Sequence, residues 1–250
     1  MSAELDGFSS NLPLVIVDTL GRTDLDEAVE EREWRNIVLT VLDVDGTGRA
    51  GLDNTADYTG GAAIRIRGNS SVDYPKKQFS VELRDSMGQD TDASLLGMPA
   101  EEDWILHAPY SDKTLQRNVL MYALSNSISR YAARTRFVEL FVCEGGETLS
   151  MSSYRGVYIL MEKLKRDDNR IAIESLDPED IAEPNVTGGY VVRRDWEPDE
   201  AEAIFTTSTY ADVLELDYPK PERITPEQRA YITDYIDGFE QALSGGSFTD

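Results

Sequence analysis

Residues 64–83 constrain the fold most strongly, because they read as two strands joined by a tight polar turn around Gly68. Apolar and polar residues alternate on both sides of this turn, and a period of two is typical of strands with one buried face. The first strand would turn Arg65 and Arg67 to the face opposite its isoleucines. The buried face of the second strand would consist of Phe79, Val81 and Leu83. The sequence therefore predicts an antiparallel hairpin over 64–83.

Four basic side chains gather in this hairpin, although the chain as a whole is strongly acidic. They are Arg65, Arg67, Lys76 and Lys77, in a chain with 24 Lys and Arg against 47 Asp and Glu and a net charge of −23. A local positive cluster in such a chain predicts a pocket for an anion, with a phosphate group as the usual candidate. The alternative is that two adjacent lysines after a proline form the solvated start of a strand.

Either lysine could face such a pocket. Strict alternation places Lys77 on the buried face with Phe79, where an ammonium group is costly unless a cleft offers it an anionic partner. A bulge near Pro75 would exchange the two lysines, so Lys76 is a candidate as well. The turn adds further donors to the same pocket from Asn69, Ser70 and Ser71.

Composition narrows the classes of protein that the chain can belong to. Its 250 residues are enough for one large domain or two small ones, and 40% hydrophobic residues suffice for a packed core. The single cysteine, Cys143, excludes an internal disulfide, and the single histidine, His107, excludes a histidine-based metal cluster. His107 is interpreted as a structural group, with a catalytic role as the alternative. The acidic charge argues against nucleic-acid binding by the whole surface, and we expect neither a membrane span nor a signal peptide.

The remaining pattern predicts an α+β chain. A helix is expected from Ser111 to about Arg130, with Asp112 as its N-cap and an apolar stripe that includes Leu120, Leu124 and Ile128. A second helix, over 225–243, is opened by a capping box with proline at its first position. Residues 85–103 are expected to form a polar connection. Further strands are predicted at 14–19, 36–43, 104–106, 137–143, 154–161 and 188–192.

Several segments, taken in order, resemble the CotH kinases, a family named after spore coat protein H. The similarity covers almost the whole chain and is most specific in the basic hairpin. Its motifs are Arg65–Ser71 with Pro75–Lys77, Trp104–Leu106, Asp112-Lys113 with Arg117-Asn118, Arg155–Tyr158 with Glu162, and Gly188–Tyr190 with Asp195.

This resemblance implies an atypical protein-kinase fold, with an antiparallel N-lobe sheet and a packed helix. Residues 1–165 would be N-lobe-like and 166–250 the start of a C-lobe-like part. Family members transfer the γ-phosphate of ATP to serine residues of a protein, using Mg²⁺ or Mn²⁺. The protein substrate would be a coat or surface protein, and the location a spore coat or an exported surface.

The resemblance also implies roles for individual residues. Lys76 or Lys77 would pair with phosphate, and Arg65, Arg67, Gly68, Asn69, Ser70 and Ser71 would cover the nucleotide, because a typical kinase glycine-rich loop is absent. Glu162 would pair with a lysine or contact the ribose, or else be a solvated strand end. Asp195 is the best local candidate for a carboxylate that substitutes for the family's metal-binding aspartates, with an ion-paired strand end beside Arg193 and Arg194 as the alternative.

In the family, the metal-binding aspartates lie in a later C-terminal segment. We therefore expect the 250 residues to form a kinase domain that is incomplete at its C-terminus, with weak or no activity. The rival hypothesis is a non-catalytic surface or coat interaction module on the same scaffold.

Overall fold

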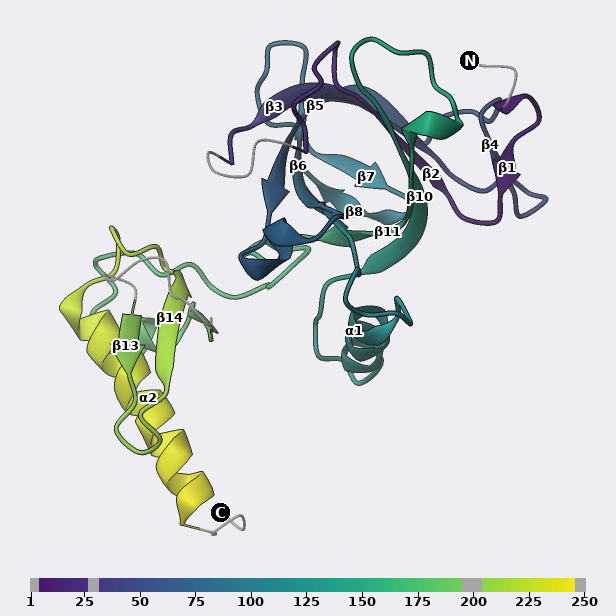
Figure 1. The fold of residues 1–250 in the computed structure, drawn as a ribbon. Coiled ribbons are helices and arrows are strands. Elements are labelled where there is room, and N and C mark those ends of the chain that lie inside the picture. Colours follow the sequence, from purple (N-terminus) through teal and green to yellow (C-terminus); the bar gives the residue numbers. More distant parts are fainter. Residues whose placement is uncertain (1–4, 27–31, 195–203, 246–250) are drawn as a thin grey trace. The chain divides into compact units, whose positions relative to one another are not determined.

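The computed structural model describes residues 5–26, 32–194 and 204–245 (Figure 1). It divides into two compact units, residues 1–164 and 165–250. The first unit is built mainly from strands and the second from a small sheet and a long helix, so the chain is α+β as predicted.

Seven strands of the first unit close into a barrel (Figure 1), in the order β10-β11-β9-β6-β5-β3-β2. The sheet is therefore a closed barrel and not the kinase-like antiparallel N-lobe sheet that the resemblance implied. All neighbours pair antiparallel except β2 and β10, whose parallel pairing joins the two edges that an open sheet would leave. The strands are β2 (Leu14–Asp18), β3 (Arg35–Leu42), β5 (Tyr58–Arg67), β6 (Gln78–Arg84), β9 (Asp103–His107), β10 (Thr135–Cys143) and β11 (Tyr154–Glu162).

Alternating side chains of these strands fill the barrel. Val15, Ile37, Ile64, Phe79 and Leu106 belong to one buried cluster with residues from all seven strands. Because burial of each such side chain contributes about 1.5–3 kcal/mol, this core is the main source of the unit's stability.

The predicted hairpin is confirmed. Strands β5 and β6 pair antiparallel with Ile64 opposite Val81 and Arg67 opposite Gln78. The turn between them contains a short 3₁₀ helix, η2 (Ser70–Asp73).

Residues 85–103 are not the polar connection that we expected. They contain β7 (Ala93–Leu95) and β8 (Met98–Glu101), which pair with each other. Leu95, Leu96 and Met98 are buried in the barrel core, so this hairpin covers part of the core. A second small pair, β1 (Ser9–Ser10) with β4 (Ala50–Gly51), lies outside the barrel sheet.

Helix α1 (Arg117–Ser127) is shorter than predicted, and its N-cap is Gln116 instead of Asp112. Val119 and Tyr122 pack on a cluster formed by Ile105, Ile159 and their neighbours. The predicted stripe is wrong in its other members, since Leu120, Leu124 and Ile128 are exposed. The helix thus touches the outside of the barrel along a narrow line.

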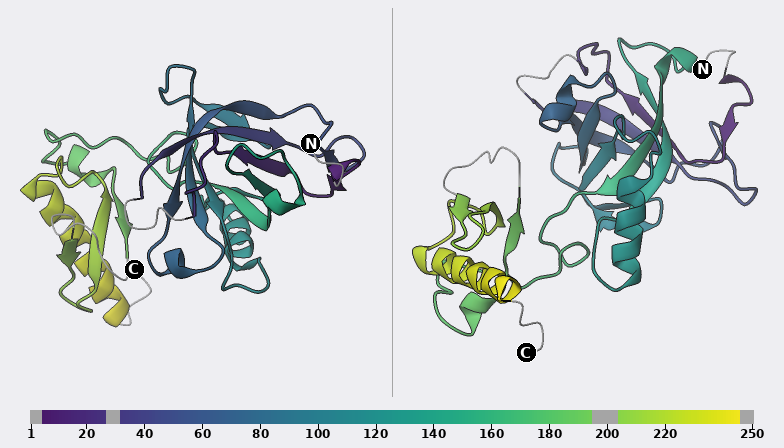
Figure 2. Two further views of the ribbon diagram at one scale, coloured as in Figure 1. Left: turned by 45° about the horizontal axis from the view of Figure 1, so that its top comes forward. Right: turned by 60° about the horizontal axis from the view of Figure 1, so that its bottom comes forward.

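The second unit consists of a small sheet and a long helix (Figure 2), and it has its own buried cluster. Its sheet has the order β12-β14-β13, formed by β12 (Val191–Arg193), β14 (Val213–Tyr218) and β13 (Ile204–Thr206). Helix α2 (Pro226–Ser244) begins with the predicted capping box, in which Thr225 and Gln228 bond reciprocally. The unit also holds the short 3₁₀ helix η4 (Asn185–Thr187), and η3 (Met151–Ser153) precedes β11 in the barrel unit. In the part of the chain that the structure describes, no helix is long and apolar enough to cross a membrane.

Candidate functional site

Arg67, Lys76 and Lys77 lie at one rim of the barrel, where residues of the neighbouring strands β5, β6, β9 and β11 follow one another across the sheet. Arg67 pairs with Gln78 across β5 and β6, the Gln78 amide bonds His107 on β9, and His107 pairs with Ile159 on β11. Residues 74–78 and the segment before α1 line two cavities beside this rim.

The first cavity lies at the mouth of the barrel and has a volume of about 330 Å³. Lys76 and Lys77 both line it. Its other lining residues are Asp26, Pro75, Phe79, Tyr110, Tyr154, Arg155 and Tyr158. We call this cavity the mouth cavity.

Both lysines at the mouth are held by backbone carbonyls. Lys76 Nζ donates to the Val157 carbonyl at 2.5 Å and lies 4.4 Å from the centre of the Tyr158 ring. Lys77 Nζ donates to the Val72 carbonyl at 2.6 Å, while its own carbonyl accepts from the Tyr158 hydroxyl at 2.9 Å. Neither lysine forms an ion pair among the described residues, so both charges remain available to an anion.

Burial affects two of the basic residues at this rim, Lys76 and Arg67. Desolvation lowers the pKa of Lys76, and the nearby carboxylate of Glu139 offsets this only in part. Desolvation also lowers the pKa of Arg67, to which no carboxylate within the described ranges is paired. A partly desolvated cation without a counter-ion costs free energy that a bound anion would recover.

Arg65 lies apart from both cavities. Its guanidinium stacks at 4.4 Å on the ring of Trp34, so it is held on the outside of the barrel. Asn69 and Ser70 are exposed and line neither cavity. The predicted group is thus brought together only in part.

The second cavity, which we call the outer cavity, lies on the outer face of the rim and has a volume of about 290 Å³. Ser71, Tyr74, Gln78 and His107 line it together with the segment that leads into α1. A wall formed by residues 74–78 and 107–111 separates it from the mouth cavity, since each segment contributes residues to both. The rings of Tyr74 and Tyr110 meet in this wall, 5.3 Å apart.

A chain of hydrogen bonds fixes the histidine of the outer cavity. Gln78 Nε2 donates to Ser71 Oγ at 2.7 Å, and Gln78 Oε1 accepts from His107 Nδ1 at 2.6 Å. The ring proton therefore lies on Nδ1, which leaves the lone pair of Nε2 as an acceptor. Burial lowers the pKa of His107, the charges of Arg67 and Lys76 lower it further, and Asp112 opposes them. His107 is accordingly neutral at pH 7.

Gly68 makes this chain of bonds possible. Its φ is +108°, and a Cβ at this position would lie 2.0 Å from Ser71 Oγ. Gly68, at the centre of the predicted basic cluster, therefore leaves the space that the Ser71 hydroxyl occupies.

Glu162 lies inside the protein at the end of β11. It is fully buried, and its carboxylate accepts from Tyr131 Oη at 3.0 Å, from the Arg134 amide at 2.9 Å and from Arg134 Nε at 2.6 Å. A solvated strand end is therefore wrong, and one basic partner of the carboxylate is Arg134. Glu162 fastens the segment between α1 and β10 to the end of β11.

Comparison of the sequence with known protein families gives a match that covers most of the chain. The family described as CotH kinase protein matches residues 64–250, which begin at the basic hairpin. The chain belongs to the CotH kinase family. No curated protein matches it. Membership indicates a kinase-like function, with nucleotide and metal use in general. Strands β2 and β3, which complete the barrel, precede the matched region.

The described residues of this CotH kinase family member do not present a set of metal ligands at the two cavities. Asp26 lies 3.4 Å from Arg155, and the Asp112 carboxylate accepts from the backbone of Thr114 and Arg117. These backbone bonds help to lower the pKa of Asp112 to about 2. Asp195, the predicted catalytic carboxylate, lies outside the described residues. Its neighbours Arg193 and Arg194 pair with Glu215 and Asp212.

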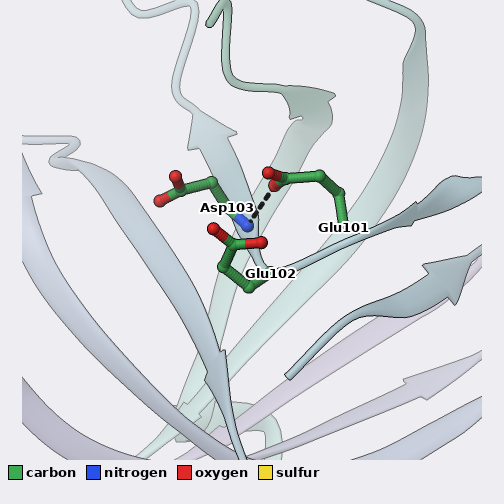
Figure 3. Close-up of side chains that lie close together, drawn as sticks. All are labelled: Glu101, Glu102 and Asp103. Carbon is green, nitrogen blue, oxygen red and sulfur yellow. Dashed lines mark hydrogen bonds between the residues drawn. The ribbon is translucent and has the colours of Figure 1, made fainter. Parts of the chain in front are cut away.

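One acidic cluster lies elsewhere on the barrel (Figure 3), where Glu101, Glu102 and Asp103 bring carboxylate oxygens within 4.8 Å of one another. A carboxylate oxygen of Glu101 accepts from the Asp103 amide at 2.5 Å, and Asp103 pairs with Lys163 at 3.0 Å. Because these groups already have partners within the protein, the cluster does not by itself identify a metal site.

The sequence reasoning left the role of His107 open and did not identify Gln78 as its partner. A signal was nevertheless present, because Gln78 begins the second strand of the hairpin and His107 directly follows the predicted strand 104–106. Once these strands are placed side by side, the two residues meet at the same rim.

Proposed function

We propose that this chain binds the triphosphate of ATP at the mouth cavity and serves phosphoryl transfer to serine residues of a protein. The observation that carries the proposal is the pair Lys76 and Lys77, whose ammonium groups line one cavity and form no ion pair among the described residues. Arg67, whose pKa is lowered by desolvation, adds a further cation near this rim.

Electrostatics supports this assignment. In a molecule of net charge −23, a partly desolvated group of cations is costly unless an anion binds there. Polyphosphate is the most suitable anion, because its oxygens can accept charge-assisted hydrogen bonds from several cations at once. Mg²⁺ or Mn²⁺ would neutralise charge on the transferred phosphoryl group. The described residues near the cavity do not supply its ligands, so we assign no step to the metal.

Isothermal titration calorimetry on the full chain tests the proposal, with ATP and pyrophosphate as ligands. We expect Lys76→Ala and Lys77→Ala each to weaken binding by about ten- to a hundredfold, because a charge-assisted hydrogen bond contributes about 1.5–3 kcal/mol. Lys220→Ala is the matched control. It removes the same charge from the second unit, where Lys220 pairs with Asp217 at 3.6 Å, and it should leave affinity nearly unchanged. Absence of binding, or binding that neither lysine affects, would contradict the proposal.

A second candidate, a non-catalytic interaction module, is favoured by one observation. Leu120, Met121, Leu124 and Ile128 form an exposed apolar face on α1 and its C-terminal end, and exposed apolar patches often mark interaction surfaces. Under this hypothesis, Leu124→Glu keeps normal polyphosphate affinity and loses association with a protein partner in a sedimentation experiment. That result would show that the apolar face of α1 acts separately from the mouth cavity. If the wild-type chain neither binds ATP nor associates, both candidates fail.

A further inference from the structure

We propose that the outer cavity is a subsite for the polypeptide substrate, in which a hydroxyl-bearing side chain donates a hydrogen bond to Nε2 of His107. The inference rests on the proposed function, because it assigns a second substrate to the same rim. It concerns recognition only. The wall of residues 74–78 and 107–111 lies between this cavity and the lysines, so no transfer step is assigned to it.

The first argument is the state of the histidine. Because Nδ1 donates to Gln78 Oε1, the ring presents Nε2 as an acceptor, and the described residues provide no hydrogen-bond partner for it. Among the described residues, three charged groups shift its pKa: Arg67 from β5 and Lys76 from the hairpin lower it, and Asp112 from the segment before α1 raises it. From β11, the cavity receives only Ile159, which is uncharged. A neutral imidazole acceptor suits a hydroxyl donor.

The second argument is the difference between the two cavities. The mouth cavity receives two lysines and an arginine, whereas the outer cavity contains no lysine. Its one arginine, Arg117, is 79% exposed and its one carboxylate, Asp112, already accepts backbone hydrogen bonds. Ser71, Ser111 and Asn118 supply neutral groups that both donate and accept, as the backbone of a bound peptide requires. The outer cavity is thus built for an uncharged ligand and the mouth cavity for an anion.

The third argument is rigidity. The relay from Ser71 through Gln78 holds the imidazole in one tautomer, and Gly68 leaves room for the Ser71 hydroxyl. A preorganised acceptor loses less entropy on binding than a mobile one.

The single histidine of the chain gives a specific probe. The ring resonances of His107 are followed by NMR while an acetylated, amidated peptide Ala-Gly-Ser-Gly-Ala is added to the full chain. We expect the serine peptide to shift these resonances. The same peptide with alanine in place of serine should bind about three- to tenfold more weakly, as loss of one neutral hydrogen bond predicts.

Two variants distinguish loss of the Nε2 acceptor from a change in the fold. His107→Asn keeps a donor for Gln78 and loses the Nε2 acceptor, so it should reduce serine-peptide affinity to that of the alanine peptide. His107→Gln can place its amide oxygen near the former Nε2 and should restore part of the difference. For both variants, affinity is read from backbone amide shifts of Ser71 and Asn118.

The outcomes distinguish this inference from the proposed function. At slightly alkaline pH, pyrophosphate affinity should depend on Lys76 and should change by no more than about twofold in His107→Asn. If the wild-type chain does not bind pyrophosphate, the proposed function is contradicted and the peptide subsite is not. The inference is overturned if the serine peptide leaves His107 unmoved, or if both peptides bind equally. It is also overturned if glycerol shifts His107 as strongly as the serine peptide, since the cavity would then take any hydroxyl.

Discussion

Gly68 shows how one residue can determine the geometry of the rim. Replacing it with alanine would place a Cβ 2.0 Å from Ser71 Oγ, at a φ of +108° that side chains rarely adopt. We predict that Gly68→Ala lowers the free energy of unfolding by about 1–3 kcal/mol and shifts the His107 ring resonances, because the relay from Ser71 is displaced.

Gly88→Ala is the control for this prediction. Gly88 also has a positive φ, +78°, but nothing lies within 4 Å of its Cβ position. In denaturant unfolding, Gly88→Ala should therefore lower the free energy of unfolding only by the cost of placing a side chain at a positive φ. Equal losses in the two variants, with His107 unmoved, would mean that the space beside Gly68 is unimportant.

Lys76 carries a charge that the fold does not require. Its ammonium is desolvated and its hydrogen-bond partner is a backbone carbonyl. We predict that Lys76→Met changes the free energy of unfolding by no more than about 1 kcal/mol, because the thioether keeps the packing on Tyr158 and removes a buried charge. The same variant should lose most pyrophosphate affinity. A loss of stability above about 2 kcal/mol would indicate a structural lysine.

At the level of single elements, Glu162 determines how the chain after α1 joins the barrel. Its buried carboxylate accepts from Tyr131 and Arg134. We predict that Glu162→Gln lowers the free energy of unfolding by about 1.5–3 kcal/mol, as expected for loss of charge-assisted hydrogen bonds, with pyrophosphate affinity nearly unchanged. Denaturant unfolding and calorimetry on the same samples check both parts. If the variant is stable but binds pyrophosphate more weakly, Glu162 takes part in nucleotide binding.

The elements that the sequence predicted correctly are those with a strong local pattern. Alternation between Ile64 and Leu83 was sufficient for the hairpin, and the capping box of Thr225 and Gln228 located the start of α2. Alternation also paired Lys77 with Phe79 on one face, and both line the mouth cavity. Lys76 reaches the same cavity because the residues before β6 do not continue its regular strand geometry.

Pairing between strands that are distant in the sequence could not be predicted from local sequence patterns. The parallel pairing of β2 with β10 joins residues more than a hundred positions apart, and it turns an open sheet into a barrel. Leu95, Leu96 and Met98 were missed because their apolar run is too short to show a period. Helix α1 showed an apolar period, but only Val119 and Tyr122 found a surface to pack on. The Gln78–His107 contact likewise depends on which strands become neighbours.

On the scale of the whole molecule, the two units have separate cores, and all seven barrel strands lie within residues 1–164. We predict that residues 1–164 fold alone and unfold in one cooperative step. Both lysines of the mouth cavity lie in this part, so it should keep pyrophosphate affinity within about threefold of the full chain. Circular dichroism with calorimetry checks this. Loss of cooperative unfolding would show that the barrel needs residues 165–250.

The central claim, that an anion binds at this rim of an acidic molecule, is tested most directly by the pKa of His107 measured by NMR with and without pyrophosphate. In the free chain, burial and the charges of Arg67 and Lys76 lower this pKa from the ordinary value of a histidine, while Asp112 opposes them. A bound anion would offset the two positive charges and favour the protonated ring, so the pKa should rise. By linkage, pyrophosphate should then bind more tightly as the pH falls through this pKa. Pyrophosphate that binds by calorimetry but leaves the pKa of His107 unchanged would show that its site lies elsewhere.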